Sequence, residues 1–157
     1  MKSIHVHFVC TGNVYRSRLA EAYLLSKQLP NIKVSSSGLE ATVNKHGPIS
    51  WYAARLAKRH DLIPQLKHSW TQTTSEIFTN TDMVIFMTDR QHEYAKEKFQ
   101  FNKELFEIWH IEDLNKADFF GTKDDTDLRR IEYSEKTFEQ IKQKVDKLAE
   151  RLTHANR

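Results

Sequence analysis

Short apolar runs alternate along the chain with longer stretches in which apolar residues recur every three or four positions. The runs have the length and composition of buried strands and cover residues 4–9, 32–36, 83–87 and 105–109. The amphipathic stretches predict helices over residues 19–28, 51–60, 73–78 and 90–99, and a last helix after an N-cap at Ser134. This alternation predicts an α/β fold, a four-stranded parallel sheet with helices covering both faces.

Composition limits the class of protein. A chain of 157 residues with 39% hydrophobic residues can bury one core, so we expect a single domain over residues 1–157. No apolar run approaches the length of a membrane span or a signal peptide, which favours a cytoplasmic protein without membrane contact. The net charge of +3 comes from interleaved basic and acidic residues, which does not indicate nucleic-acid binding.

Cys10 is the only cysteine, so an intramolecular disulfide and a cysteine-rich zinc site are both excluded. His5 and His7 share one face of the first predicted strand, but no carboxylate or cysteine accompanies them as a third ligand. We therefore expect neither a metal nor any other cofactor.

The segment between the first strand and the first helix carries the candidate chemistry. Backbone N–H groups and the positive end of the helix dipole meet there, which suits a phosphate group. A helix N-terminus and a neighbouring cation favour a nucleophilic thiolate, so Cys10 is the candidate nucleophile and Arg16 the cation. The loop around the phosphate would consist of Thr11, Gly12, Asn13, Val14, Tyr15 and Ser17.

Several loop residues suit separate tasks. The planar guanidinium of Arg16 can hold two phosphoryl oxygens at once. Gly12 allows the backbone to approach closely, and Asn13 tolerates a left-handed backbone. The hydroxyl of Ser17 can support the thiolate through a hydrogen bond.

The sequence CTGNVYRS at residues 10–17 resembles the signature loop of the low-molecular-weight protein tyrosine phosphatase family, C-x-G-N-x-C-R-S, and departs from it at Tyr15. VSSSGLEA, HSWTQT and TDMVIFMTD are similar to further family segments. The resemblance implies hydrolysis of phosphotyrosine in proteins, or of small aryl phosphates, through a phosphocysteine on Cys10, with inorganic phosphate as product and inhibitor. It also implies a hydrogen-bond network that holds the loop, made by Asn13, Ser17, Ser36 and His68.

The general acid has two candidates by the same resemblance. The family carries it in an Asp-Pro-aromatic segment, and this chain divides that pattern between IEDL, with Asp113, and ADFFG, with Asp118. An acid is needed because a phenol leaving group has a pKa of about 10 and departs more readily when protonated. We expect Asp113, since the fourth strand ends near Trp109 and Asp113 then lies close above the sheet; Asp118 is the alternative.

Aromatic side chains are expected to wall a slot for the substrate ring. By analogy with the family, one wall follows the second strand and the other comes from the acid-bearing loop, which singles out Trp51 and Phe120. The stretch from His110 to about Glu132 is long enough to form a functional flap.

Three other functions use the same kind of loop. Arsenate reduction through a disulfide relay needs further cysteines, which this chain lacks. Hydrolysis of arginine phosphate remains open, although family members with that preference carry Thr at the position of Val14. A phosphate-binding interaction module with little turnover is the third alternative, because the acid segment departs from the family pattern.

Overall fold

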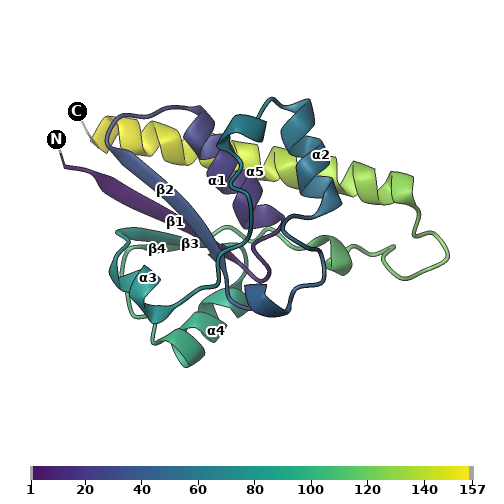
Figure 1. Cartoon of the computed structure of the whole chain (residues 1–157), viewed down its shortest axis with the longest axis horizontal. Helices are drawn as coiled ribbons and strands as arrows, with labels where there is room; N and C mark the ends of the chain where they lie inside the picture. The colour runs from purple at the N-terminus through teal and green to yellow at the C-terminus, as the bar shows by residue number, and fades with distance from the viewer. Residues whose placement is uncertain (1, 156–157) are drawn as a thin grey trace.

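β1 (Ile4–Cys10) is a central strand of a four-stranded sheet in the computed structural model, which describes residues 2–155 (Figure 1). Its neighbours are β2 (Ile32–Gly38) and β3 (Met83–Phe86), and β4 (Phe106–Ile108) pairs with β3. The order is therefore β2-β1-β3-β4, and every pair is parallel. This arrangement confirms the predicted four-stranded parallel sheet.

Helices cover both faces of the sheet, as predicted (Figure 1). One face carries α1 (Arg16–Ser26), α2 (Trp51–Arg59) and α5 (Asp127–Ala155). The other face carries α3 (Ser75–Thr79) and α4 (Asp89–Phe99). Three short 3-10 turns lie in the connections, η1 (Ala41–Val43), η2 (Ile63–Gln65) and η3 (Leu114–Lys116).

The core is divided between the two faces because side chains alternate along each strand. Val6 and Phe8 of β1 join Ile85 of β3 in the buried cluster beneath α1 and α5. Val9 and Val84 point the opposite way, into a second cluster beneath α3 and α4. Because β3 is buried on both faces, it reads in the sequence as a continuous apolar run, and β1 does so apart from His5 and His7.

The start of α5 corrects the predicted N-cap at Ser134. The helix begins at Asp127, and the preceding Thr126 caps it, because its Oγ1 accepts a hydrogen bond of 3.2 Å from the N–H of Arg129. Ser134 is buried inside the helix and donates to the carbonyl of Ile131 at 2.7 Å. The first turns of α5 are mostly exposed, Leu128 included, so the apolar spacing that marks the helix begins later in the sequence.

The carboxyl ends of the strands meet at one edge of the sheet, where α1 begins directly after the loop that follows β1 (Figure 1). Parallel α/β sheets bind ligands at this edge. None of the helices within residues 2–155, the 29-residue α5 included, has an apolar stretch able to cross a membrane.

Candidate active site

The backbone carbonyl groups of the loop after β1 are bonded to neighbouring segments. The N–H of Asn13 points toward the centre of the loop, at the sulfur of Cys10, and a concave arrangement of loop N–H groups binds anions. Within the described residues, no side chain caps the start of α1, so the positive end of that helix also faces this centre. The N–H groups of Leu39, Glu40 and Ser50 donate to the carbonyls of Cys10, Thr11 and Val14 at 3.0, 2.8 and 2.9 Å.

Cys10 ends β1 at the floor of this loop and is only 3% exposed. Its Sγ lies 2.8 Å from Ser17 Oγ and 3.3 Å from the N–H of Asn13, which donates to it. Asn13 Nδ2 in turn donates to Ser17 Oγ at 2.8 Å. Since Ser17 Oγ accepts from Asn13, its own proton is free to point at the sulfur, which stabilises a thiolate.

Asn13 is the centre of the network that holds the loop. Its backbone is left-handed, with φ of 55°, as its residue type allows. Besides Ser17, its Nδ2 donates to Ser36 Oγ at 2.9 Å, and its Oδ1 accepts from the N–H of Thr71 at 2.8 Å. Ser36 Oγ in turn donates a hydrogen bond of 2.9 Å to Glu21 Oε1. The loop is thus attached to α1, β2 and the segment before α3.

Arg16 is the first residue of α1 and is 4% exposed, with its guanidinium beside the cavity. Its Nη1 donates to the carbonyl of Ile111 at 2.8 Å, and its Nη2 lies 4.0 Å from Asp113 Oδ2. Five N–H groups are available on a guanidinium, so further donors remain for a phosphoryl group. Arg16 therefore joins the loop to the segment after β4.

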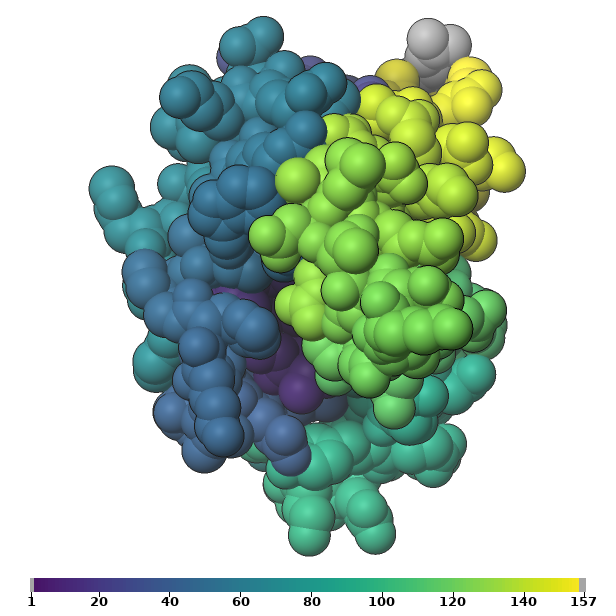
Figure 2. All heavy atoms as spheres, turned by 90° about the vertical axis from the view of Figure 1, so that its right-hand side faces the viewer, coloured from purple at the N-terminus to yellow at the C-terminus, as the bar shows by residue number. Residues whose placement is uncertain are grey.

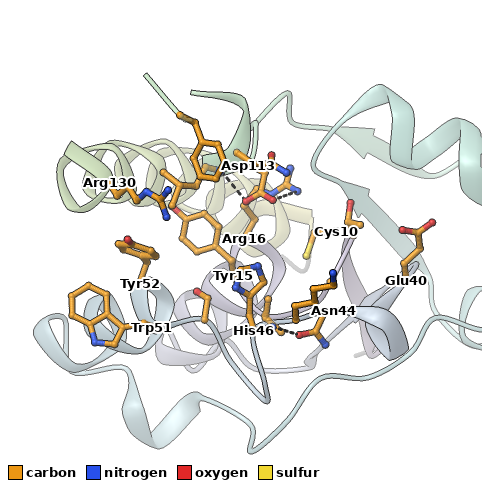
Figure 3. Close-up of a pocket in the computed structure, with 18 of the residues that line it drawn as sticks. Cys10, Tyr15, Arg16, Glu40, Asn44, His46, Trp51, Tyr52, Asp113 and Arg130 are labelled. Carbon is orange, nitrogen blue, oxygen red and sulfur yellow. Dashed lines mark hydrogen bonds and ion pairs between the residues drawn. The ribbon is translucent and has the colours of Figure 1, made fainter. Parts of the chain in front are cut away.

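A cavity of about 490 Å³ opens over Cys10 and Arg16. Figure 2 shows its mouth as a hollow between the segment that includes η1 and α2, in blue, and the segment that leads into α5, in green, with atoms of the N-terminal loop at its floor. In Figure 3, Cys10 and Arg16 lie deep in the site, while Trp51, Tyr52 and Arg130 stand toward one end. The cavity has room for an aromatic phosphate.

The predicted wall residues Trp51 and Phe120 both line this cavity, and Tyr52 lines it with them. Trp51 is 61% exposed and meets Tyr52 edge to face, with ring centroids 5.1 Å apart. The guanidinium of Arg130 lies 4.5 Å from the ring centre of Phe120, a cation-π contact. Asp125 fixes Arg130 by two hydrogen bonds of 2.7 Å.

Residues 5–157 match the model of the family described as low molecular weight phosphotyrosine protein phosphatase. The chain belongs to this family. The low molecular weight protein-tyrosine-phosphatase Etp of Escherichia coli K12 is 39% identical over 79 residues, which cover 50% of this chain and 51% of that relative. The match therefore spans about half the length of Etp.

Two other known proteins match almost the whole chain. A protein-arginine-phosphatase of Geobacillus stearothermophilus is 29% identical over 149 residues, which cover 92% of this chain and 93% of the relative. The crystal structure of a YwlE mutant from Bacillus subtilis has a TM-score of 0.75 at 24% identity, covering 96% of this chain and 99% of that one. This likeness shows that the two proteins share a fold.

The two candidate acids lie in different places. Asp113 lines the cavity, and its side chain, 38% exposed, accepts a hydrogen bond of 2.8 Å from the N–H of Leu114 at the start of η3. Asp118 is exposed beyond η3 and does not line the cavity. Of the two carboxylates, Asp113 is the one that lines the cavity together with Cys10 and Arg16.

His68 requires a correction. It was expected to hold the loop, but its side chain is exposed and, among residues 2–155, makes no hydrogen bond with Asn13, Ser17 or Ser36. The N–H of Thr71 occupies Asn13 Oδ1 instead. Residues 66–74 form neither a helix nor a strand, so no regular spacing of apolar residues indicates which side chains of this segment face the loop.

Two site residues were missed by sequence analysis. Gly38 ends β2 against the loop, where a Cβ atom would lie 2.7 Å from backbone atoms of Thr11, Gly12 and Asn13. A Cβ on Gly12 would meet no protein atom closer than 3.5 Å, so a close approach of its backbone to a bound phosphate stays a prediction. Gln91 of α4 is buried and donates to Thr11 Oγ1 at 3.2 Å. A glycine at the end of a predicted strand was the available signal for Gly38.

Among the described residues, no group of three or more His, Cys, Asp or Glu side chains is arranged to hold a metal ion. The hydroxyl of Ser35 lies between the two strand histidines, 2.7 Å from His5 Nε2 and 2.6 Å from His7 Nδ1. The pair is part of a hydrogen-bonded chain that continues from His7 Nε2 to Ser37 Oγ at 2.7 Å.

Proposed function

We propose that this protein is a tyrosine phosphatase that hydrolyses phosphotyrosine through a covalent phosphocysteine on Cys10. The observation that carries the proposal is the placement of one sulfur, buried at the floor of a cavity, with the N–H of Asn13 donating to it and Arg16 lining the same cavity. A phosphoryl group held by those donors presents its phosphorus to the sulfur.

In the first step the thiolate of Cys10 attacks phosphorus, the S–P bond forms, and the bond from phosphorus to the phenol oxygen breaks. Asp113 donates a proton to the departing oxygen from the side of the cavity. Arg16 holds two equatorial phosphoryl oxygens as they spread in the transition state.

In the second step a water molecule attacks the phosphocysteine and Asp113 takes its proton. The S–P bond breaks, inorganic phosphate leaves, and Cys10 returns as a thiolate. The hydroxyl of Ser17 and the N–H of Asn13 stabilise that leaving sulfur, since both point at it. Phosphate retains affinity for the loop and is therefore also an inhibitor.

The wall of Trp51, Tyr52 and Phe120 supports an aromatic substrate, because a phenyl ring can lie against it while the phosphate reaches the loop. The substrates are phosphotyrosine side chains of proteins, and small aryl phosphates serve as models. A reducing cytoplasm is the proposed location, because the reaction needs the thiol of Cys10 to stay free. We treat residues 1–157 as a single domain.

Hydrolysis of arginine phosphate is the second candidate, favoured by the arginine phosphatase relative that covers 92% of the chain. Glu40 and Asp113 both line the cavity, and carboxylates attract a guanidinium. The apolar Val14 at the cavity favours the tyrosine substrate.

The test is a comparison of kcat/KM for matched peptides that carry phosphotyrosine or phosphoarginine at one position. We expect the phosphotyrosine peptide to be at least about tenfold better. The opposite ranking would establish the arginine activity. If neither peptide is hydrolysed although inorganic phosphate binds, the protein is a binding module and the enzymatic proposal is wrong.

A further inference from the structure

Lys67 lies behind the phosphate loop, in a second cavity of about 440 Å³ that shares no lining residue with the substrate cavity. Its Nζ donates to the carbonyl of Ser36 at 2.8 Å and to Thr71 Oγ1 at 3.0 Å. Both residues also bind the side-chain amide of Asn13, Ser36 at Nδ2 and Thr71 at Oδ1, and Ser17 is its third partner. One ammonium group therefore bridges two of the three supports of Asn13.

The backbone of Lys67 is attached to the same loop by a separate route. Its carbonyl accepts a hydrogen bond from Arg18 Nη2. Arg18 is completely buried, and its Nη1 donates to the carbonyls of Asn13 at 3.2 Å and Pro48 at 2.9 Å. The position of Lys67 relative to the loop is thus set by its main chain, so its side chain reaches Ser36 and Thr71 from a fixed base.

We propose that Lys67 is a positioning residue for the phosphate loop. It holds the loop in place, the role that the family resemblance implies for the neighbouring His68. Asn13 directs its N–H at Cys10 Sγ and its amide at Ser17, so a shift of that amide moves the donors around the sulfur. Lys67 prevents the shift by joining Ser36 to Thr71. The inference rests on the proposed function only in that the loop must bind a phosphoryl group.

The charge on Lys67 should make this support depend on pH. Burial lowers the pKa of Lys67 to about 8, although the carboxylate of Glu21 acts in the opposite direction. Above that pH the ammonium group loses a proton and becomes a neutral amine. Its two hydrogen bonds are then weaker, because the donor is no longer charged. The ionisable groups that face it are Glu21 and Arg18 of α1, Cys10 and His7 of β1, and, around the cavity, His5 and Glu76.

The experiment measures the Kd of inorganic phosphate by calorimetry between about pH 7 and 9.5, in a Cys10→Ser background so that no thiol titrates. We expect Lys67→Met to weaken binding by about tenfold at pH 7, as for loss of a charged hydrogen-bond donor. In the parent the Kd should rise above pH 8, whereas Lys67→Arg keeps its charge and should give a flatter profile. Lys58→Met, at an exposed position of α2, is the matched control and should behave as the parent.

Melting temperatures are recorded for every variant. If Lys67→Met stays folded and binds phosphate as tightly as the parent, with the same pH profile, the inference is overturned. If Lys67→Met does not fold, Lys67→Arg provides the test. A rise in Kd above pH 8 that is as large in this variant as in the parent would overturn the inference, because arginine keeps its charge and the rise cannot then come from Lys67. Phosphate binding requires no turnover, so a failure of the peptide assays would leave this test intact.

Discussion

Arg16 and Asp113 face each other at the substrate cavity, with Nη2 of the arginine 4.0 Å from Oδ2 of the carboxylate. The same guanidinium donates to the carbonyl of Ile111, two residues before Asp113. The residue proposed to bind the phosphoryl group therefore also contacts the segment that carries the proposed acid. In the proposed mechanism, this contact would keep Asp113 beside the leaving oxygen.

Asp113→Asn should slow phosphotyrosine hydrolysis by about a hundredfold, because an amide cannot protonate the phenolate. Substrates with acidic leaving groups should suffer much less, since they depart without a proton. The measurement is kcat/KM, which reports the steps up to formation of the phosphocysteine and not its hydrolysis, for a series of aryl phosphates of decreasing leaving-group pKa. Asp118→Asn serves as the matched control on the same loop, and a steep leaving-group dependence in that variant would move the acid to Asp118.

Cys10→Ser should abolish turnover and keep the phosphate site, because the hydroxyl has nearly the size of the thiol but is a far weaker nucleophile. Product release and phosphate binding are measured on the same pure preparation. Appreciable hydrolysis by this variant would contradict covalent catalysis on Cys10.

Arg16→Lys should lose most of the activity, at least about a hundredfold in kcat/KM. An ammonium group keeps the positive charge but cannot hold two phosphoryl oxygens in one plane. It also cannot contact the carbonyl of Ile111 and the carboxylate of Asp113 at the same time as the phosphoryl group. Steady-state assays with an aryl phosphate give the comparison. Near-native turnover would mean that charge alone suffices at this position.

The loop could be predicted from the sequence because its chemistry is local. A strand, a short connection and a helix bring Cys10, Asn13 and Arg16 together whatever the rest of the chain does. The parallel sheet could also be predicted, since β3 is an apolar run and β1 is mostly apolar, each of ordinary strand length. Ser36 followed from a matching segment, and its side chain lies where the resemblance implied.

The supports behind the loop could not be predicted. Thr71 reaches Asn13 across 58 residues of sequence, and the segment that carries it has no regular period, so nothing indicated that Lys67 would face inward and His68 outward. The role of Arg18 could not be predicted either. A fully buried arginine on a helix is uncommon, and its partners are backbone carbonyls of other segments.

His7 should make the fold sensitive to acid. Burial lowers the pKa of His7 to about 3, whereas an unfolded histidine has a pKa of about 6.5. As the pH falls from 6.5 toward 3, His7 binds a proton in the unfolded state but stays neutral in the folded state. The free energy of unfolding should therefore fall by up to about 1.4 kcal/mol per pH unit from this group.

Urea denaturation of His7→Gln across that range checks the expectation. The variant loses some stability near neutral pH, because Gln does not reproduce both hydrogen bonds to Ser35 and Ser37. Its stability should nevertheless decline less steeply with acid than that of the parent. His154→Gln, at an exposed position near the end of α5, is the control, and equal slopes in all three proteins would exclude His7 as the titrating group.

Oxidation of Cys10 should be hard to reverse, because the chain contains no second thiol. The thiolate, reached through the cavity, attacks one oxygen of hydrogen peroxide, the O–O bond breaks, and a sulfenic acid forms with hydroxide as the leaving group, which a proton from solvent converts to water. A neighbouring thiol would condense with the sulfenic acid to a disulfide and release water, and ordinary reductants could then restore the cysteine. Tyr15, where the family loop carries its second cysteine, cannot do this. Further peroxide instead oxidises the sulfenic acid to a sulfinic acid, which ordinary reductants do not reverse.

The experiment compares the natural protein with Tyr15→Cys after prolonged peroxide and then excess thiol. Tyr15 is 6% exposed and belongs to the buried cluster beneath α1 and α5, so the variant should lose about 2–4 kcal/mol of stability and is compared per folded molecule. The natural protein should regain less activity than the variant, and its intact mass should show two added oxygen atoms. Inorganic phosphate should slow the inactivation of both proteins, because it occupies the loop above the sulfur. If the natural protein recovers as fully as Tyr15→Cys, the absence of a second thiol has no consequence for its oxidation and the prediction is wrong.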